Sequence, residues 1–195
     1  MVLLHNLRNN NFNVSEDVII NRIQSPLTNS DIERLFPEIG GTIKYNEIKN
    51  YNDIDELLPD DKCFKVILIE QDNNVGHWVC ISKYDNTIEY FNPYGTKVDN
   101  DKRWIGKLKN MLLGQCEDVL SKLMEKSKYK CVYSKTKFQK ISNKLDIQTC
   151  GRWCCLRLIC LRDLDMDLNK FKKFIKDNTK ASGLPKDALV CVYIS

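Results

Sequence analysis

The chain has 195 residues, 43% of them hydrophobic and 29% charged, and its 30 Lys and Arg residues against 26 Asp and Glu residues give a net charge of +4. A chain of this length buries enough surface to fold without disulfides or metals, and so small a net charge favours an ordinary mixed surface, although it permits weak nucleic-acid binding. No apolar run approaches the roughly 20 residues of a membrane span, and no signal peptide is apparent. We therefore expect one soluble intracellular domain over residues 1–195, with reduced thiols and no membrane partner.

The first part of the chain is predicted to hold short segments. Residues 1–24 include the Asn-rich "NLRNNNFN" and are expected to form a loosely packed N-terminal arm. Short helices are expected at 25–37 and 51–61, because each apolar pattern is ended by a proline. The "GG" at 40–41 predicts a turn.

The middle of the chain changes to strand patterns. Residues 63–71, "CFKVILIEQ", are nearly all apolar, which predicts a central strand. Residues 77–85 alternate, and residues 87–95 follow a "DN" turn, so the three runs predict an antiparallel meander. Residues 130–140 predict a fourth strand, and residues 188–195, "ALVCVYIS", also have strand character.

Helical patterns fill the rest of the chain. Three segments have such patterns. The first is residues 104–127, the second begins at Cys150, and the third is the amphipathic run 167–178. Strands followed by packed helices predict an α+β fold. We expect a mixed central sheet of about five strands, with the helix from Cys150 buried against it and further helices around.

The cysteine-rich stretch "DIQTCGRWCCLRLICLRDLD" raises the question of a nucleophile. Cys150 is expected at a helix N-terminus, where the helix dipole lowers a thiol pKa. Gly151 would let the backbone pack closely and leave an amide for an oxyanion. Cys154, Cys155 and Cys160 fall inside the helix and are predicted to be core residues. The spacing does not match paired C-x2-C zinc ligands, so no metal site is predicted.

A thiol nucleophile needs an imidazole, and the chain has two histidines. His5 belongs to the N-terminal arm, whereas His77 opens a strand and can face a cleft. Asn92, at the end of the next strand, is expected near His77 and can accept from its ring. Glu89 is the carboxylate alternative to Asn92 as the partner of His77. Side chains alternate along a strand, and Glu89 falls on the opposite face from Asn92, which predicts that it faces solvent. The plainer alternatives are a surface histidine and a turn-forming asparagine.

Three other side chains near these positions are assigned structural roles. Trp78 is expected to pack beside the cleft. Arg152 and Arg157 are expected to pair with carboxylates such as Asp163 or Asp165.

These motifs resemble a known family. "GHWVCISKYDNTIEYFNPYG" followed by "QTCGRWCCLRLI" is similar to adenain, the adenovirus maturation protease, and to its Ulp-type relatives, and resembles most the capsid-maturation proteases of virophages and polintons. The order His77, Asn92, Cys150 differs from the Cys, His, Asn order of papain-like enzymes. The resemblance covers roughly residues 25 to 165, and it is specific because three separate motifs occur in the right order.

The resemblance implies roles for individual residues. Cys150 would be the nucleophile and His77 the general base and acid. Asn92 stands where adenain has a glutamate and the Ulp enzymes an aspartate, and an amide cannot stabilise an imidazolium by charge. The family's oxyanion glutamine is expected at Gln139, since Gln148 lies too close to Cys150 in sequence.

The resemblance also implies a biological setting. The substrates would be capsid or other virion precursor proteins, cut in the host cytoplasm at the site of virus assembly or inside the virion. The chemistry would need no cofactor, whereas activation by DNA or by a viral peptide, as in adenain, would be a regulatory addition. Two alternatives remain open: a protease for ubiquitin-like modifiers with the same fold, and a non-catalytic binding module whose thiols are structural.

Overall fold

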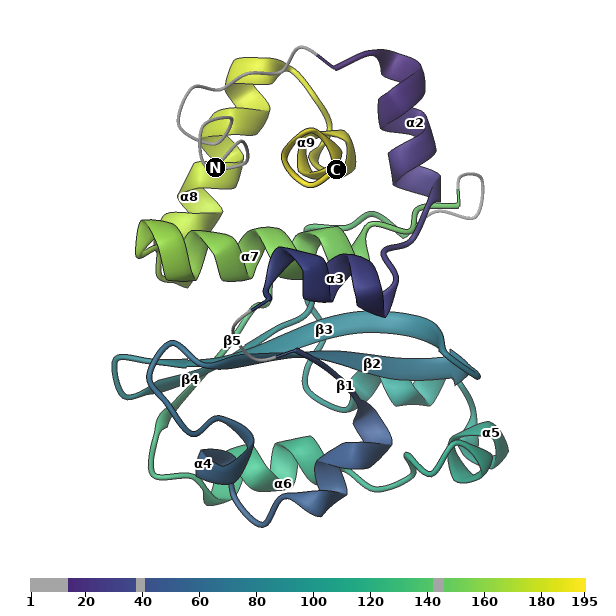
Figure 1. Ribbon diagram of the computed structural model, residues 1–195, viewed down its shortest axis with the longest axis vertical. Helices are drawn as coiled ribbons and strands as arrows, with labels where there is room; N and C mark the ends of the chain where they lie inside the picture. Colours follow the sequence, from purple (N-terminus) through teal and green to yellow (C-terminus); the bar gives the residue numbers. More distant parts are fainter. Residues whose placement is uncertain (1–13, 38–40, 142–145) are drawn as a thin grey trace.

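The computed structural model describes residues 14–37, 41–141 and 146–195. Within them the chain forms three layers, with a five-stranded sheet between two groups of helices (Figure 1). The general fold class is therefore α+β with a mixed sheet, as the sequence predicted. None of the described helices is long and apolar enough to cross a membrane.

The strands of the sheet lie in chain order. β2 (Phe64–Asp72), β3 (Val75–Tyr84) and β4 (Thr87–Phe91) form the predicted antiparallel meander. The edge strands β1 (Thr42–Lys44) and β5 (Lys130–Tyr133) each pair in parallel with their neighbour. β1 was not predicted, because a three-residue strand is too short to show alternation.

Helices cover both faces of the sheet (Figure 1). The upper group comprises α2 (Glu16–Gln24), α3 (Asn29–Leu35), α7 (Cys150–Leu164), α8 (Leu168–Ser182) and α9 (Lys186–Tyr193). The lower group comprises η1 (Tyr45–Asn50), α4 (Ile54–Leu57), α5 (Lys107–Leu112) and α6 (Val119–Lys126). A further 3-10 helix, η2 (Asn100–Trp104), precedes α5.

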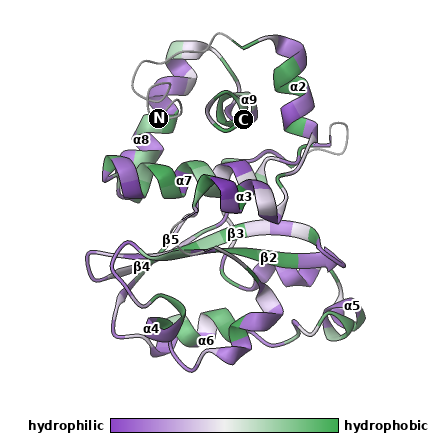
Figure 2. Ribbon diagram, viewed as in Figure 1, coloured by the Kyte–Doolittle hydropathy of each residue, from purple (hydrophilic) through white to green (hydrophobic). Residues whose placement is uncertain are grey.

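Each face of the sheet has its own apolar core. α7 is buried continuously from Cys150 to Leu161, so it is the central helix of the upper layer. The lower core includes Ile67 and Ile81 from the sheet and Leu120 from α6. In Figure 2 hydrophobic colouring is prominent along the strands and on α9, whereas α8 carries much hydrophilic colouring. Because both faces are covered, alternation along a strand does not separate buried from exposed residues here.

The predicted strand at 188–195 is wrong. This run forms helix α9, and its residues from Asp187 to Tyr193 are all buried. α9 packs on α2, α7 and α8, away from the sheet (Figure 1). A short apolar run fits a buried strand or a buried helix equally well by periodicity. Here a helix satisfies its own backbone groups inside an all-helical layer.

The predicted helix at 104–127 is interrupted. Gly106 and Gly114 adopt φ values of 84° and 68°, which a continuous right-handed helix does not allow. The segment therefore divides into the end of η2, α5 and α6.

The N-terminal arm is only partly as expected. Residues 1–13, with His5, lie outside the described residues. Residues 16–24 form α2, which packs on α9, and the Arg22 guanidinium donates to the carbonyl oxygen of Cys191 over 2.8 Å. This part of the arm therefore belongs to the helical layer.

Candidate active site

His77 lies near the start of β3, where that strand meets the end of β2. Gly76 permits a close approach, since a Cβ at this position would lie 2.1 Å from the carbonyl oxygen of Ile69. The His77 side chain is only 4% exposed. The alternative of a surface histidine at a strand end therefore does not hold.

Asn92 lies beside His77, as the antiparallel register of β3 and β4 predicted. Its Oδ1 is 3.0 Å from Nε2 of His77 and 2.9 Å from the backbone nitrogen of Tyr94. A backbone N–H can only donate, so Oδ1 is fixed as the acceptor. In the neutral ring Nε2 therefore carries the hydrogen, and Nδ1 keeps its lone pair.

Cys150 is the first residue of α7, as predicted. The backbone N–H of Trp78 donates to its sulfur over 3.5 Å. A Cβ on Gly151 would lie 3.1 Å from Cβ of Leu27 and 3.2 Å from Cδ1 of Trp78, so the absence of a side chain lets the helix start close against β3. Trp78 is buried here as a packing residue, and its indole N–H donates to the carbonyl oxygen of Leu27.

The imidazole and the thiol shift each other's pKa toward an ion pair. Burial opposes charge on His77, but its hydrogen bond with Cys150 and the thiolate charge outweigh burial, and the pKa of His77 is raised with further help from Asp101 and Asn92. Burial likewise opposes a thiolate, but His77 and the backbone N–H groups of Trp78 and Gly151 lower the pKa of Cys150. Among the described residues Nδ1 makes no hydrogen bond of ordinary geometry, so it is the ring nitrogen left to interact with the sulfur.

The other thiols of α7 behave as core residues. Cys154, Cys155 and Cys160 are fully buried. Burial raises the pKa of Cys160 to about 12 and raises the pKa values of Cys154 and Cys155 far above the usual range. The prediction that these three are structural is confirmed, and Cys150 is the exception on this helix.

A narrow cleft of about 190 Å³ gives access to the thiol. It is lined by Gln71, Gly76, His77, Tyr94, Lys140, Ile141, Asp146, Ile147, Gln148 and Cys150. The ring of Tyr94 stacks on the imidazole, with centroids 4.2 Å apart and planes 11° apart. Trp104 in turn packs edge-on against Tyr94. The aromatic stack therefore supports one face of the His77 ring.

Gln139 is not among the residues that line this cleft. Its side-chain amide donates to the carbonyl oxygen of Ile147 over 2.7 Å and to the hydroxyl of Tyr94 over 3.4 Å. The amide of Gln139 is therefore turned to two cleft residues, and its expected oxyanion contact stays a prediction. Gln148 does line the cleft with Cys150, and only Thr149 separates the pair in sequence.

Asp101 is a buried carboxylate beside the site that the sequence analysis missed. It is 3% exposed, and its Oδ2 lies 3.8 Å from Nε2 of His77. Asn92 donates through Nδ2 to the same oxygen, and Thr96 donates to Oδ1 over 2.6 Å. In the sequence, the only signal for Asp101 was its position shortly after the strand predicted at 87–95, because "KVDNDK" resembles an ordinary polar loop.

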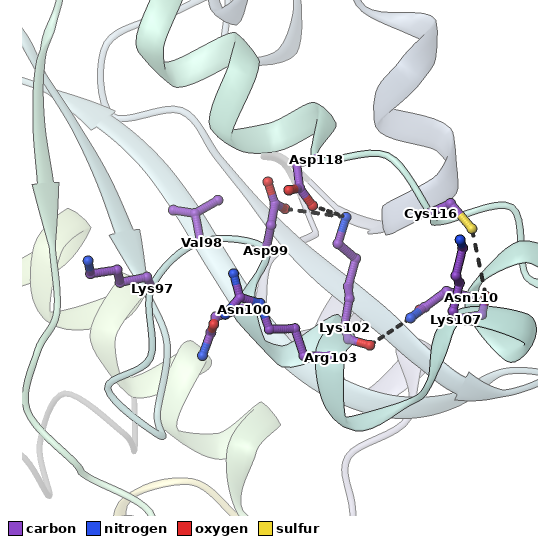
Figure 3. A pocket seen from close by; sticks show the side chains of 10 residues that line it. All are labelled: Lys97, Val98, Asp99, Asn100, Lys102, Arg103, Lys107, Asn110, Cys116 and Asp118. Carbon is purple, nitrogen blue, oxygen red and sulfur yellow. Dashed lines mark hydrogen bonds and ion pairs between the residues drawn. The ribbon is translucent and has the colours of Figure 1, made fainter.

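The helix that carries Asp101 is anchored by its neighbour Lys102 (Figure 3). The Lys102 ammonium lies 2.9 Å from a carboxylate oxygen of Asp118 and donates to the carbonyl oxygen of Glu117 over 2.6 Å. Asn110 donates to the Lys102 carbonyl oxygen over 2.6 Å. Lys102, Asn110 and Asp118 also line a separate cavity of about 530 Å³, so η2 is tied both to α5 and to the loop before α6.

Two predictions about charged residues are wrong. Glu89 is 1% exposed rather than solvent-facing, because its face of the sheet is covered by α7. Its carboxylate pairs with Arg157, so the expected pairing of Arg157 with a carboxylate is confirmed, with a partner other than Asp163 or Asp165. Arg152 donates instead to the carbonyl oxygens of Ser25 and Ile194.

The fold and the site define an α+β protein with a buried Cys–His–Asn cluster at the mouth of a narrow cleft. No family model matches the chain. The chain is 37% identical over 166 residues to uncharacterized protein V9 of the Sputnik virophage, a match that covers 84% of this chain and 91% of V9. This protein belongs to the same family as V9, which indicates a viral origin.

Proposed function

We propose that this protein is a cysteine endopeptidase that cuts virion precursor proteins. One observation carries the proposal: the ring of His77 is held by Asn92 at Nε2 and leaves Nδ1 to a thiol at a helix N-terminus. A buried structural thiol would have a raised pKa, as Cys155 has, whereas the pKa of Cys150 is lowered. A lowered thiol pKa beside an imidazole is what a nucleophilic cysteine needs.

The proposed reaction begins with the ion pair of Cys150 and His77. The thiolate attacks the carbonyl carbon of a peptide bond and forms a C–S bond and an oxyanion. The first N–H groups of α7 have no partner within the helix, so the Cys150 N–H is available to the oxyanion. When the C–N bond breaks, the imidazolium passes its Nδ1 proton to the departing amine.

Water completes the cycle. His77, now neutral, takes a proton from water as the water attacks the thioester carbonyl carbon. The C–S bond then breaks, which releases the carboxyl product and restores the thiolate and imidazolium. Asn92 keeps the ring oriented through both steps because its own amide is fixed by Tyr94 and Asp101.

The surface beside the cleft supports a protein substrate. Trp104 is 54% exposed and touches the cleft residue Tyr94. α5 follows directly and exposes Leu108, Met111 and Leu112 by 67%, 60% and 78%. We call these four residues the α5 patch. Contiguous exposed apolar side chains are typical of surfaces that bind other proteins.

The viral relationship supports the choice of substrate. V9 is encoded by a virophage. The proteins that a viral endopeptidase meets during particle assembly are the precursors of the virion. We therefore place the activity in the host cytoplasm, where particles form, and inside the virion.

The test mixes the protein with a capsid protein encoded by the same genome, and sequences the new termini that appear. Cys150→Ala is expected to abolish cleavage, while Cys155→Ala, a truncation on the same helix, is expected to cleave at the same bonds. A parallel arm offers a probe ending in the C-terminal tail of a ubiquitin-like modifier. Cleavage of that probe with an intact capsid protein would favour a modifier protease, and cleavage of neither substrate would favour a binding module.

A further inference from the structure

An amide beside His77 leaves the charge of an imidazolium unbalanced. Asn92 can orient the ring through Oδ1, but it is neutral, and a buried cation without a counter-charge is costly. The His77 side chain is 4% exposed, so water does not supply the missing stabilisation. The thiolate of Cys150 supplies a counter-charge on one side of the ring, and a second counter-charge has to come from a residue beyond Asn92.

Asp101 stands at the required place. Its Oδ2 receives a hydrogen bond from Nδ2 of Asn92, and the same oxygen lies 3.8 Å from Nε2 of His77. Asn92 therefore lies between the ring and the carboxylate. Its Oδ1 accepts from Tyr94 and its Nδ2 donates to Asp101, and only one orientation of the amide allows both hydrogen bonds. Reversing the amide would place its oxygen against Asp101 and its nitrogen against the N–H of Tyr94, so neither contact would be a hydrogen bond.

The position of Asp101 is itself fixed. Thr96 donates to its other oxygen over 2.6 Å, and Thr96 also accepts from Nδ2 of Asn92 over 2.5 Å. On the opposite side, Lys102 ties η2 to the loop before α6. The carboxylate cannot turn away from Asn92 without breaking contacts on both sides of η2.

We propose that Asp101 is the positioning residue of the site, and that it sets the orientation of the Asn92 amide, the Nε2–H tautomer of His77 and the counter-charge for its imidazolium. This inference rests on the proposed function, and it extends the Cys150–His77–Asn92 cluster to a fourth residue. The thiolate, the imidazole ring, the amide and the carboxylate then follow one another in a row. One negative charge lies on each side of the imidazolium.

The other titratable groups around the ring do not replace this carboxylate. Cys150 faces the ring from α7. Tyr94 stacks on it, and burial raises the Tyr94 pKa far above the usual range, so this residue stays neutral. Lys140 and Asp146 line the mouth of the cleft and are exposed to solvent. Tyr90, below Asn92, also has a strongly raised pKa owing to burial.

The test replaces the charge with almost no change of shape. Asp101→Asn removes the negative charge and offers Asn92 both a donor and an acceptor, so the orientation of the Asn92 amide is held by the Tyr94 N–H alone. We expect the alkaline limb of kcat/KM to move to lower pH, because the imidazolium loses its proton more easily. A fall of one pH unit corresponds to about a tenfold smaller population of the ion pair at alkaline pH. The acid limb, where the ring is charged before and after the thiol ionises, should move little.

A second measurement does not depend on activity. The chain has two histidines, so nitrogen-15 NMR of the imidazole rings gives a simple spectrum, and a His77→Ala variant assigns it. In the native protein the neutral His77 ring should show hydrogen on Nε2. In Asp101→Asn it should show a mixture of tautomers and a lower titration midpoint.

Two variants serve as controls. Asp99→Asn changes a buried carboxylate two residues away, which binds Tyr45 and the backbone of Ser121 instead of Asn92. It should lower stability but leave the pH profile and the tautomer unchanged. The swapped variant Asn92→Asp/Asp101→Asn exchanges the amide and the carboxylate, retains the hydrogen bonds and should restore the pH profile. It also serves as the test if Asp101→Asn alone does not fold.

The outcomes separate this inference from the proposed function. Native protein that cuts no precursor would overturn the endopeptidase, while the NMR measurement would still decide the role of Asp101. An active native protein whose Asp101→Asn variant keeps the pH profile and the Nε2–H tautomer would overturn the inference alone. A swapped variant whose His77 titration midpoint stays as low as that of Asp101→Asn would overturn it as well.

Discussion

The guanidinium of Arg157 on α7 holds the carboxylate of Glu89 on β4 through two parallel hydrogen bonds, Nε to Oε1 at 2.6 Å and Nη2 to Oε2 at 2.7 Å. Both side chains are 1% exposed, and Arg157 also donates to the carbonyl oxygen of Met166. β4 leads to Asn92, and α7 begins with Cys150. The buried pair therefore fixes α7 to β4. It holds the helix of the candidate nucleophile Cys150 against the strand that leads to Asn92, and Asn92 orients His77.

Breaking this pair should destabilise the fold strongly. Glu89→Ala would leave the Arg157 cation buried without its partner, and we expect the free energy of unfolding to fall by about 3–5 kcal/mol. Urea denaturation measures the change. As a control, Asp163→Ala removes a carboxylate from a pair whose side chains are 28% and 20% exposed, and it should cost about 1 kcal/mol or less. Equal losses in the two variants would contradict the structural role of the buried pair.

The thiol of Cys150 should react at unusually low pH. Its pKa is lowered from the ordinary value of 9.0, and only the thiolate reacts with iodoacetamide. We expect the alkylation rate to reach half its maximum below pH 9. In His77→Ala the midpoint should rise above 9, because burial then acts on the thiol without the opposing imidazolium.

The alkylation experiment needs a background without competing thiols. Among the described cysteines Cys116 is the exposed one, so both proteins should carry Cys116→Ser. Mass spectrometry of the alkylated peptide identifies the modified residue. Modification of Cys155 at the same rate as Cys150 would argue for a structural thiol at both positions.

The glycine beside His77 should not tolerate a side chain. In Gly76→Ala the new Cβ would meet the backbone of β2, 2.1 Å from the carbonyl oxygen of Ile69, and that backbone is held by its pairing with β3. Forcing extra atoms into such a packed site costs about 1–3 kcal/mol, and displacement of His77 should lower kcat by about 10²-fold.

The control for this glycine lies far from the cleft. Gly183 ends α8 with a φ of 70°, and Gly183→Ala should cost about 1 kcal/mol through backbone strain alone. It should leave kcat unchanged. A Gly76→Ala protein with native kcat would show that β2 and β3 have more freedom at this point than the structure indicates.

The α5 patch should contribute to binding of the substrate. Trp104→Ala removes an exposed ring that borders the cleft through Tyr94, and we expect KM for a protein substrate to rise about tenfold, equivalent to roughly 1.4 kcal/mol of binding energy. The alkylation rate of Cys150 should not change. Ile20→Ala, which truncates an exposed apolar side chain on α2, is the matched control and should alter neither quantity. A Trp104→Ala protein with unchanged KM would place the substrate elsewhere.

Local patterns were sufficient to predict much of the site. The alternating run at 77–85 and the tight turn after it brought His77 and Asn92 together, because register in an antiparallel pair follows from the turn. The polar stretch before Cys150 predicted the start of a helix. These features depend on neighbours in sequence, so the sequence expresses them directly.

The errors share a different cause. Glu89 was predicted to face solvent from strand alternation, but α7 covers that face. The run at 188–195 has the composition of a strand and became a helix because its surroundings are helices. In each case the environment is built by residues distant in sequence.

The sequence by itself determined the α+β class, the positions of His77 and Asn92 on adjacent strands, and a cysteine at the start of a buried helix, because periodicity and turn chemistry act over a few residues. Only the tertiary structure decided which charges enter the interior. Asp101 and Glu89 are buried as partners of Asn92 and Arg157. A buried charge is stable only where another group pairs with it or binds it by hydrogen bonds, and such groups come together only when the chain is folded.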